Sequence, residues 1–354
     1  MKKTLVAVAA LAAIGAAQAQ SSVTLGGIID GGVASYSNQG GKSLTEFGGS
    51  GESAPSIWYI SGKEDLGGGM SAGFKLEGGY SAASGAISNS NGGIFGREAH
   101  ADLSGAFGTV SAGLQLDAAF LSVAAFDPRG YSMFGSALNS WTTSGLTAGG
   151  QGSTTLINIF NQNAISYSNR VGPVNGTIQY VFGGVAGNSS ANSITSGSLG
   201  YSANGLTLSA GAFQDKNSKD NGGTNEYDFG AAYAFGDASL SAGYVDFKRQ
   251  GANTTGHSVA TTLGGGTYKL GATVLSLGYY STQDKTTSGT LKVLAAGADY
   301  ALSKSTSLYA QVQSAKNAGF ASSNNNVVLS NADGAGASAN TTVTGFAVGI
   351  RKGF

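Results

Sequence analysis

Residues that could carry out catalysis are few in this chain of 354 residues. It has no cysteine and two histidines, His100 and His257, which lie far apart in the sequence. A serine nucleophile needs a histidine base and an acid that orients the histidine, so a triad would have to use one of these two residues. Among this many serines, a serine near a histidine is expected by chance. We therefore predict that the protein is not an enzyme.

Candidate sites for ions and phosphates are equally sparse. Carboxylate oxygens are the ligands that Ca²⁺ prefers, and four acids could hold this ion between loops: Asp215, Asp220, Glu226 and Asp228. Solvated loop charge is the simpler interpretation of these acids. The glycine runs 67–69 and 264–266 lack the Gly-Lys-Ser/Thr ending of a phosphate-binding loop, and neither opens a helix. The sequence thus predicts no metal site and no cofactor.

The composition excludes several classes of protein. Charged residues make up 11% of the chain and glycine accounts for 59 residues, whereas average proteins have about 25% charged residues and roughly 7% glycine. After the first 19 residues no segment approaches the ~20 apolar residues of a membrane helix. Removal of Lys2 and Lys3 from the 19 basic residues leaves 17 against 19 acidic ones. Since phosphate binding needs a basic face, we expect no nucleic-acid partner.

The first residues have the order of an export signal. Met1-Lys2-Lys3 is a short basic region, residues 4–15 are apolar and small, and Ala17-Gln18-Ala19 supplies a cleavage site. The alternative is a buried N-terminal helix. We predict a signal peptide over 1–19, cleaved to leave a mature chain over 20–354. Because this exported chain has no cysteine, its stability must come from something other than disulfides.

The mature chain is dominated by alternating patterns typical of β-strands, apart from a possible short turn of helix within 117–150. Apolar side chains alternate with small or polar ones in several segments, including 177–182, 227–235, 238–244 and 308–313. The second face is mostly Gly, Ser, Thr and Gln with few charges, unlike the exposed face of a soluble sandwich. In a membrane barrel, the apolar face contacts lipid and the small polar face lines water. A wide barrel also explains the abundant glycine, because its interior has no packed core.

Short and long connections alternate along the chain, as they do in outer-membrane barrels. Eight long polar connections, the first over 37–55 and the third over 117–160, imply sixteen strands. The 335 residues that remain when 19 are removed from 354 leave about 21 for each strand and its connection, which suits tilted membrane strands of ~9–11 residues. The sequence therefore predicts an all-β fold, a 16-stranded antiparallel transmembrane β-barrel.

Several segments resemble the Gram-negative trimeric porins of the betaproteobacterial type. They are 22–30 (SVTLGGIID), 62–69 (GKEDLGGG) with 73–77 (GFKLE), 95–99 (FGREA), 103–110 (LSGAFGTV) and the closing strand 344–354. The resemblance implies sixteen antiparallel strands, a homotrimer in the outer membrane in contact with lipid and lipopolysaccharide, and passive diffusion of small hydrophilic solutes and ions. It also implies a third long loop that folds inward and narrows the pore.

That loop corresponds here to residues of about 117–154, the alternative being an external flap. Long structureless loops are usually functional. Asp127-Pro128 matches the loop pattern of the family, so the resemblance makes Asp127 the first candidate for an acid at the pore constriction. Arg129 could face this acid or pair with it.

The wall facing the loop carries an arginine cluster in such porins, and Arg97 matches one of its positions. Ile57 and Phe160 stand where the family often has a base. Lys63 and Lys75 are possible replacements, because alternation places Lys75 and Glu77 opposite the apolar face of this strand. The departures favour neutral or weakly polar solutes over strong anion selectivity.

Alternation also places three polar residues on the face opposite Arg97: Glu98, His100 and Asp102. Either Arg97 or the set of Glu98, His100 and Asp102 would then be on the outer face of the barrel. Whichever of the two lies there must avoid lipid by lying at a subunit contact or at the rim.

Two alternatives stay open. One is a substrate-selective porin whose loop aromatics form an apolar path for neutral or weakly polar solutes: Phe120, Phe126, Tyr131, Phe134 and Trp141. The other is a secreted Gly/Asn-rich adhesin without a pore, although a solenoid should show one fixed repeat.

Overall fold

The computed structural model describes residues 22–39, 42–49, 51–88, 90–138, 159–251, 257–319, 326–328, 336–338 and 340–354. The predicted signal peptide, the part of the predicted loop after Leu138, and Trp141 lie outside these residues. The strands are β1 Ser22–Gln39, β2 Lys42–Phe47, β3 Ile57–Gly67, β4 Met70–Gly79, β5 Glu98–Gly105, β6 Gly108–Leu116, β7 Phe160–Val171, β8 Val174–Val181, β9 Ile194–Ala203, β10 Leu206–Lys216, β11 Gly222–Phe235, β12 Ala238–Gly251, β13 His257–Leu270, β14 Thr273–Asp284, β15 Thr290–Ser303, β16 Thr306–Ala318, β17 Asn326–Val328, β18 Gly336–Ser338 and β19 Thr342–Gly353. The helix α2 spans Ala118–Ala124.

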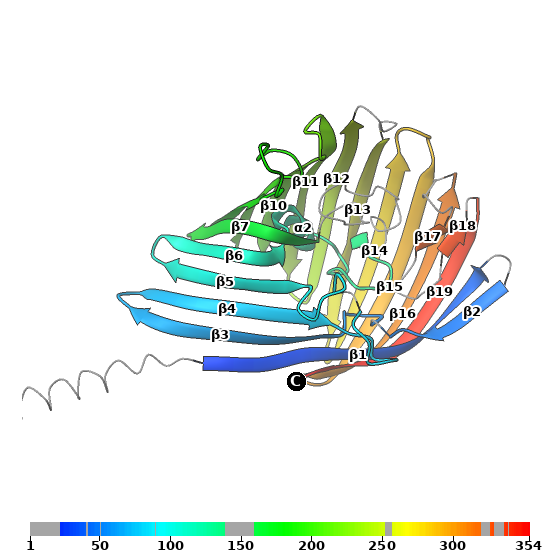
Figure 1. The fold of residues 1–354 in the computed structure, drawn as a ribbon. Helices are drawn as coiled ribbons and strands as arrows, with labels where there is room; N and C mark the ends of the chain where they lie inside the picture. Colours follow the sequence, from blue (N-terminus) through cyan, green and yellow to red (C-terminus); the bar gives the residue numbers. More distant parts are fainter. Residues whose placement is uncertain are drawn as a thin grey trace, which may run out of the picture.

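The main sheet closes on itself as an antiparallel barrel (Figure 1). Its last strand, β19, pairs with β1, and β9 pairs with β10. The strand β1 contacts β2 through its C-terminal half and β3 through its N-terminal half. Since β2 and β3 share one position, the described strands of this sheet fill sixteen positions around the barrel, which confirms the predicted fold. The small hairpin β17–β18 is separate from it.

The two faces of the wall differ as the alternation predicts. In β11, Tyr227, Phe229 and Tyr233 are half or more exposed, while Glu226 and Asp228 at the alternate positions are buried. Exposed apolar side chains recur around the outside, where a barrel in a membrane contacts lipid. None of the helices in the described part is long and apolar enough to cross a membrane.

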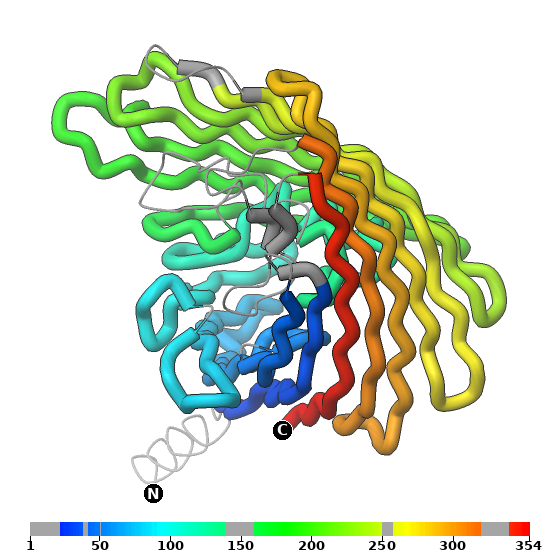
Figure 2. The backbone as a smooth tube through the Cα atoms, turned by 90° about the vertical axis from the view of Figure 1, so that its right-hand side faces the viewer, coloured from blue at the N-terminus to red at the C-terminus, as the bar shows by residue number. Residues whose placement is uncertain are grey.

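Short turns lie at one end of the barrel. Figure 2 shows the C-terminus at this end, next to the turn between β15 and β16. The Gly353 amide donates a hydrogen bond of 2.7 Å to the carbonyl of Ser305 in that turn. In outer-membrane barrels, the end with short turns faces the periplasm and the end with longer loops faces outward.

The predicted long connection over 37–55 differs from the structure. Here β1 continues to Gln39 and pairs with β2, and the departure from the wall is confined to residues 48–56. The side chain of Asp30 in β1 accepts hydrogen bonds from the backbone amides of Glu52, Ser53 and Ala54 at 3.3, 3.1 and 2.8 Å. These bonds satisfy amides that have no strand partner, and they hold the segment against β1.

The third long connection enters the barrel, as far as it is described. Its helix α2 begins after Asp117, whose side chain accepts bonds from the amides of Ala119 and Phe120 at 2.8 and 3.2 Å. Such an N-cap satisfies donors that have no partner within the helix. The helix contacts β9, β10 and β11, and Ser122 Oγ donates to Asp228 Oδ1 over 2.5 Å.

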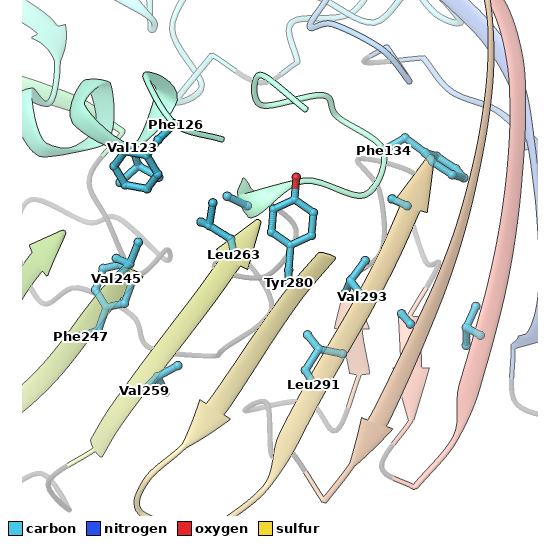
Figure 3. Packing of buried hydrophobic residues seen from close by; sticks show 14 of the residues in the cluster. Val123, Phe126, Phe134, Val245, Phe247, Val259, Leu263, Tyr280, Leu291 and Val293 are labelled. Carbon is cyan, nitrogen blue, oxygen red and sulfur yellow. The ribbon is translucent and has the colours of Figure 1, made fainter. Parts of the chain in front are cut away.

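The abundant glycine has a second cause, because a packed core does exist between the loop and the wall (Figure 3). Phe126 lies on Gly230 and Gly243, where an added Cβ would come within 2.2 Å of its ring. Pro128 and Arg129 lie less tightly on Gly265 and Gly278, where an added Cβ would be 2.9 Å from Pro128 Cβ and 3.0 Å from Arg129 Cδ. These four glycines, which we call the glycine seat, let the loop approach the backbone of β11–β14 closely.

Candidate pore constriction

Asp127 shapes the inward loop. Its carboxylate accepts bonds from Tyr280 Oη at 2.6 Å and from the amides of Arg129, Tyr131 and Ala137 at 3.1, 3.0 and 3.3 Å. Burial raises the pKa of Asp127, and these hydrogen bonds oppose the increase. The side chain of Asp127 points into the loop and does not line the cavity described below. An acid at the constriction, which is the role predicted for Asp127, would have to face that cavity.

Arg129 fastens the loop to the opposite wall. Its Nη1 donates to Ser276 Oγ at 2.9 Å, and its Nη2 donates to the carbonyl of Phe134 at 3.0 Å and to Gln311 Oε1. Burial lowers the pKa of Arg129, which the charge of Asp127 opposes. All three of these acceptors, on β14, β16 and the loop itself, are uncharged.

A cavity of about 680 Å³ lies between the loop and the lumen face of the wall. Residues 129–133 of the loop and 53–55 of the segment after β2 border it, together with side chains of β14, β15, β16 and β19. The charged residues that line it in the described chain are three arginines and one acid: Arg97, Arg129, Arg351 and Asp299. This cavity is the candidate constriction.

Arg351 in β19 is a lining residue that the sequence analysis did not select. Its Nη1 donates to Ser53 Oγ at 2.8 Å, and its Nη2 lies 3.3 Å from Asp299 Oδ1. About a third of its side chain is exposed. A signal was present in the sequence, because Arg351 shares a face with Gly345, Ala347 and Gly349, and the small residues of a porin strand face water.

Residues 53–55, within the segment 48–56, also border the cavity. The carbonyl of Ser53 accepts a bond from the Met133 amide at 3.3 Å, and Gln311 Nε2 donates to the carbonyl of Glu52 over 3.3 Å. The segment therefore ties the loop to β16 as well as to β1. Nothing in its sequence distinguished it from an external loop.

A chain of ion pairs and histidine hydrogen bonds runs along the lumen face of β4 and β5. Its contacts are Arg97–Glu77 (2.7 Å), Lys75–Glu77 (2.8 Å), Lys75–Glu98 (2.5 Å), His100–Glu98 (3.2 Å) and His100–Asp102 (2.9 Å). Lys75 and Glu77 thus lie inside, opposite the exposed ring of Phe74.

The prediction that Arg97 lies on the face opposite Glu98, His100 and Asp102 is wrong. Alternation holds only within a strand, and β5 begins at Glu98, one residue after Arg97. The Arg97 guanidinium forms an ion pair with Glu77 (Nε to Oε1, 2.7 Å), which places its side chain with the others in the lumen.

The remaining candidates are spread over the wall. Lys63 lies farther along β3, on the face of Tyr59, and is exposed without lining the cavity. Phe160, at a position where the family often has a base, supports Arg97 instead, with the guanidinium 4.7 Å from the ring centre.

The loop aromatics are of two kinds, buried against the wall or bordering the cavity. Phe126 and Phe134 are buried against the wall, whereas Phe120 and Tyr131 stack on each other at 4.5 Å and border the cavity.

The acids considered for Ca²⁺ lie in different places. Glu226 and Asp228 lie behind α2, and Asp220 pairs with Lys216 at 3.1 Å. In the part of the chain that is described, no group of three or more potential ligands could hold a metal ion.

A closed barrel with a loop folded into its lumen defines a membrane channel, and the comparisons agree. Residues 6–320 match the family of Gram-negative porins. The chain belongs to this family, and it is a passive diffusion channel of the outer membrane.

Its relatives include outer membrane porin protein 32 of Delftia acidovorans, which is 32% identical over 372 aligned residues covering all of both chains. The structure is similar to the anion-selective porin from Comamonas acidovorans, with a TM-score of 0.80, 27% identity, and coverage of 94% of this chain and 100% of that one. The trimer form of OmpT from Vibrio cholerae has the same fold, with a TM-score of 0.69, 15% identity, and coverage of 94% and 99%.

Proposed function

We propose that the channel is a homotrimer, exported by cleavage after Ala19, whose constriction passes small hydrophilic solutes and prefers anions to cations. The observation that carries the preference is the lining of the cavity, which has three arginines and one carboxylate among its described residues. A low-dielectric passage with an excess of one charge raises the local concentration of the opposite ion. The name of the Comamonas porin, which calls that protein anion-selective, supports the same reading.

The three arginines do not contribute equally. Arg97 and Arg351 are paired with Glu77 and Asp299, which reduces the field that each adds. The guanidinium of Arg129 bonds to three uncharged oxygens, so its charge acts on the passage without a contacting carboxylate in the described chain. We expect a preference for anions that is real but smaller than that of a wall of unpaired bases.

A second candidate function concerns solutes with an apolar body. Phe120, Tyr131, Met133 and Phe160 border the same cavity as the arginines. Such a lining favours organic solutes, neutral or anionic, that place an apolar part against the loop. Of the loop aromatics, Phe120 and Tyr131 border the cavity, which supports this candidate, while Phe126 and Phe134 are buried against the wall.

The experiment that tests the proposal is the reversal potential of the purified trimer in a planar bilayer with a KCl gradient. Three-step channels with a reversal potential of anion sign support it. A potential of cation sign, or a folded protein that forms no channels, contradicts it. Replacing chloride by benzoate tests the second candidate, because an apolar lining predicts that benzoate current exceeds the value expected from its mobility.

A further inference from the structure

Two lysines lie directly opposite each other on the outer surface of the barrel. Lys292 of β15 and Lys316 of β16 are register partners, and both are exposed. Their side chains point outward, since Leu294 and Val312, an even number of residues away on the same strands, are half exposed on that face. The pair is therefore on the surface that contacts the membrane and not in the lumen.

This pairing is unfavourable as it stands. Residues directly opposite in antiparallel strands have Cβ atoms about 4.5–5.5 Å apart, and like charges at that spacing destabilise a sheet. Their neighbours in the same row are Ser281 of β14 and Thr342 of β19, which are uncharged. Among the described residues, neither lysine makes an ion pair, and the outward acid Asp246 is paired with Lys285. An anion from outside the chain would turn the repulsion into a binding site.

The position of the pair identifies the leaflet. The lysines lie near the loop that joins β14 to β15 over 285–289, at the opposite end of β15 from its short turn with β16. In a porin this is the outward end, so the pair sits at the level of the outer leaflet headgroups.

An apolar groove lies directly below the lysines. The next outward row toward the short turns is Tyr279, Leu294, Ser314 and Thr344, and the row after it is Leu277, Ala296, Val312 and Phe346. All of these eight residues except Tyr279, with Ser35 and Ser37 of β1, line a groove of about 660 Å³. Rows two residues apart are separated by about 7 Å along the strand. A positive pair above an apolar groove matches a phosphate above an acyl chain.

We propose that Lys292 and Lys316 bind a phosphate group of lipopolysaccharide in the outer leaflet, with one of its acyl chains in the groove beneath. Lipopolysaccharide is the anionic lipid of that leaflet, which is why we choose it over a phospholipid of the inner leaflet. The proposal uses the outer-membrane location of the family and does not depend on the anion preference of the lumen.

The test measures binding of rough-form lipopolysaccharide to the detergent-purified trimer, stripped of lipid, by native mass spectrometry. The variant Lys292→Gln/Lys316→Gln should bind at least tenfold more weakly than the wild type, and the single variant Lys292→Gln should lie between them. Its matched control, Lys269→Gln/Lys304→Gln, removes two exposed lysines near the short turns and should bind normally. Dephosphorylated lipopolysaccharide should bind the wild type as weakly as the phosphorylated lipid binds the double variant.

Equal affinity of the double variant and the wild type would overturn the proposal, and so would equal affinity for the dephosphorylated lipid. Loss of the trimer in the double variant, without loss of lipid affinity, would instead assign the lysines to a subunit contact. Channel conductance provides the separate readout, because neither lysine faces the lumen. A normal channel with unchanged lipid binding rejects this inference alone and leaves the pore function intact.

Discussion

Arg351, three residues from the C-terminus, donates a hydrogen bond of 2.8 Å to Ser53, which lies in the segment between β2 and β3. The bond connects the closing strand β19 to residues 48–56, the segment that leaves the barrel wall between β2 and β3. The Ser53 carbonyl in turn accepts a bond from Met133 of the inward loop. This part of the constriction therefore depends on three segments that are far apart in the sequence.

The change Arg351→Gln should reduce the anion preference of the channel. It removes one of three cationic groups that line the cavity, and it leaves Asp299 without its partner. We expect the anion-to-cation permeability ratio, measured from reversal potentials in a KCl gradient, to fall on the order of twofold. The control Lys63→Gln removes a lumen charge away from the cavity and should change the ratio less. An unchanged ratio in the first variant would show that Arg351 does not face the ion path.

Loss of the Asp127 carboxylate should loosen the loop. In Asp127→Ala, the buried amides of Arg129, Tyr131 and Ala137 lose their acceptor, at a cost of about 1–3 kcal/mol for each group left unsatisfied. The expected result is a larger and noisier single-channel conductance with the barrel still folded. The exposed acid Asp65, changed to Ala, is the control. Conductance and noise equal to the wild type would contradict this role for Asp127.

The glycine seat predicts an asymmetric effect of alanine. An added Cβ at Gly230 would lie 2.2 Å from the Phe126 ring, whereas at Gly264 its nearest neighbour would be 3.5 Å away. Overpacking of this kind costs typically 1–3 kcal/mol. We expect Gly230→Ala to lower the midpoint of thermal unfolding in detergent and Gly264→Ala to leave it nearly unchanged. Equal midpoints would mean that the loop moves aside without cost.

Glu52 should make stability depend on pH. It lies in the 48–56 segment outside the strands, where burial, followed by the charges of Asp30 and Glu46, raises its pKa from 4.5 to about 8. Between these values the folded chain holds a proton that the unfolded chain has lost. Its contribution to the free energy of unfolding is therefore fully present below about pH 4.5 and is lost as the pH rises through about 8.

The change Glu52→Gln should flatten the pH dependence of the unfolding free energy over this range, as measured by urea denaturation in detergent at several pH values. Part of the slope will persist, because burial also raises the pKa of Asp117 and Asp127. The exposed residue Glu64, changed to Gln, serves as the control. A slope as steep in Glu52→Gln as in the wild type would place the titrating group elsewhere.

Alternation along single strands was enough to predict the barrel and the water-facing side of most strands. Lys75 and Glu77 were placed correctly for this reason, since both lie well inside β4. Arg97 was misplaced because it precedes the first residue of β5, where the chain bends and the period of two does not apply. The shared position of β2 and β3 was missed because it depends on register with β1, a long-range property that local patterns do not contain.

The constriction was harder to predict for a related reason. The motif Asp127-Pro128 marks the loop, but the direction of the carboxylate is decided by Tyr280, which is 153 residues away. Arg129 is likewise held by Ser276 and Gln311. The sequence identified which residues belong to the loop, while their contacts with later strands determine which of them face the passage.

The glycine seat has a consequence for how the channel is built. Phe126 rests on Gly230 and Gly243, and Pro128 rests on Gly265, so the glycines that support this part of the loop come from the second half of the chain. Phe126 and Pro128 therefore have no glycine seat to dock on until β11–β14 have paired. During biogenesis the pore is therefore narrowed only after more than half of the wall is assembled, and a nascent barrel arrested before that stage would be a leak in the membrane.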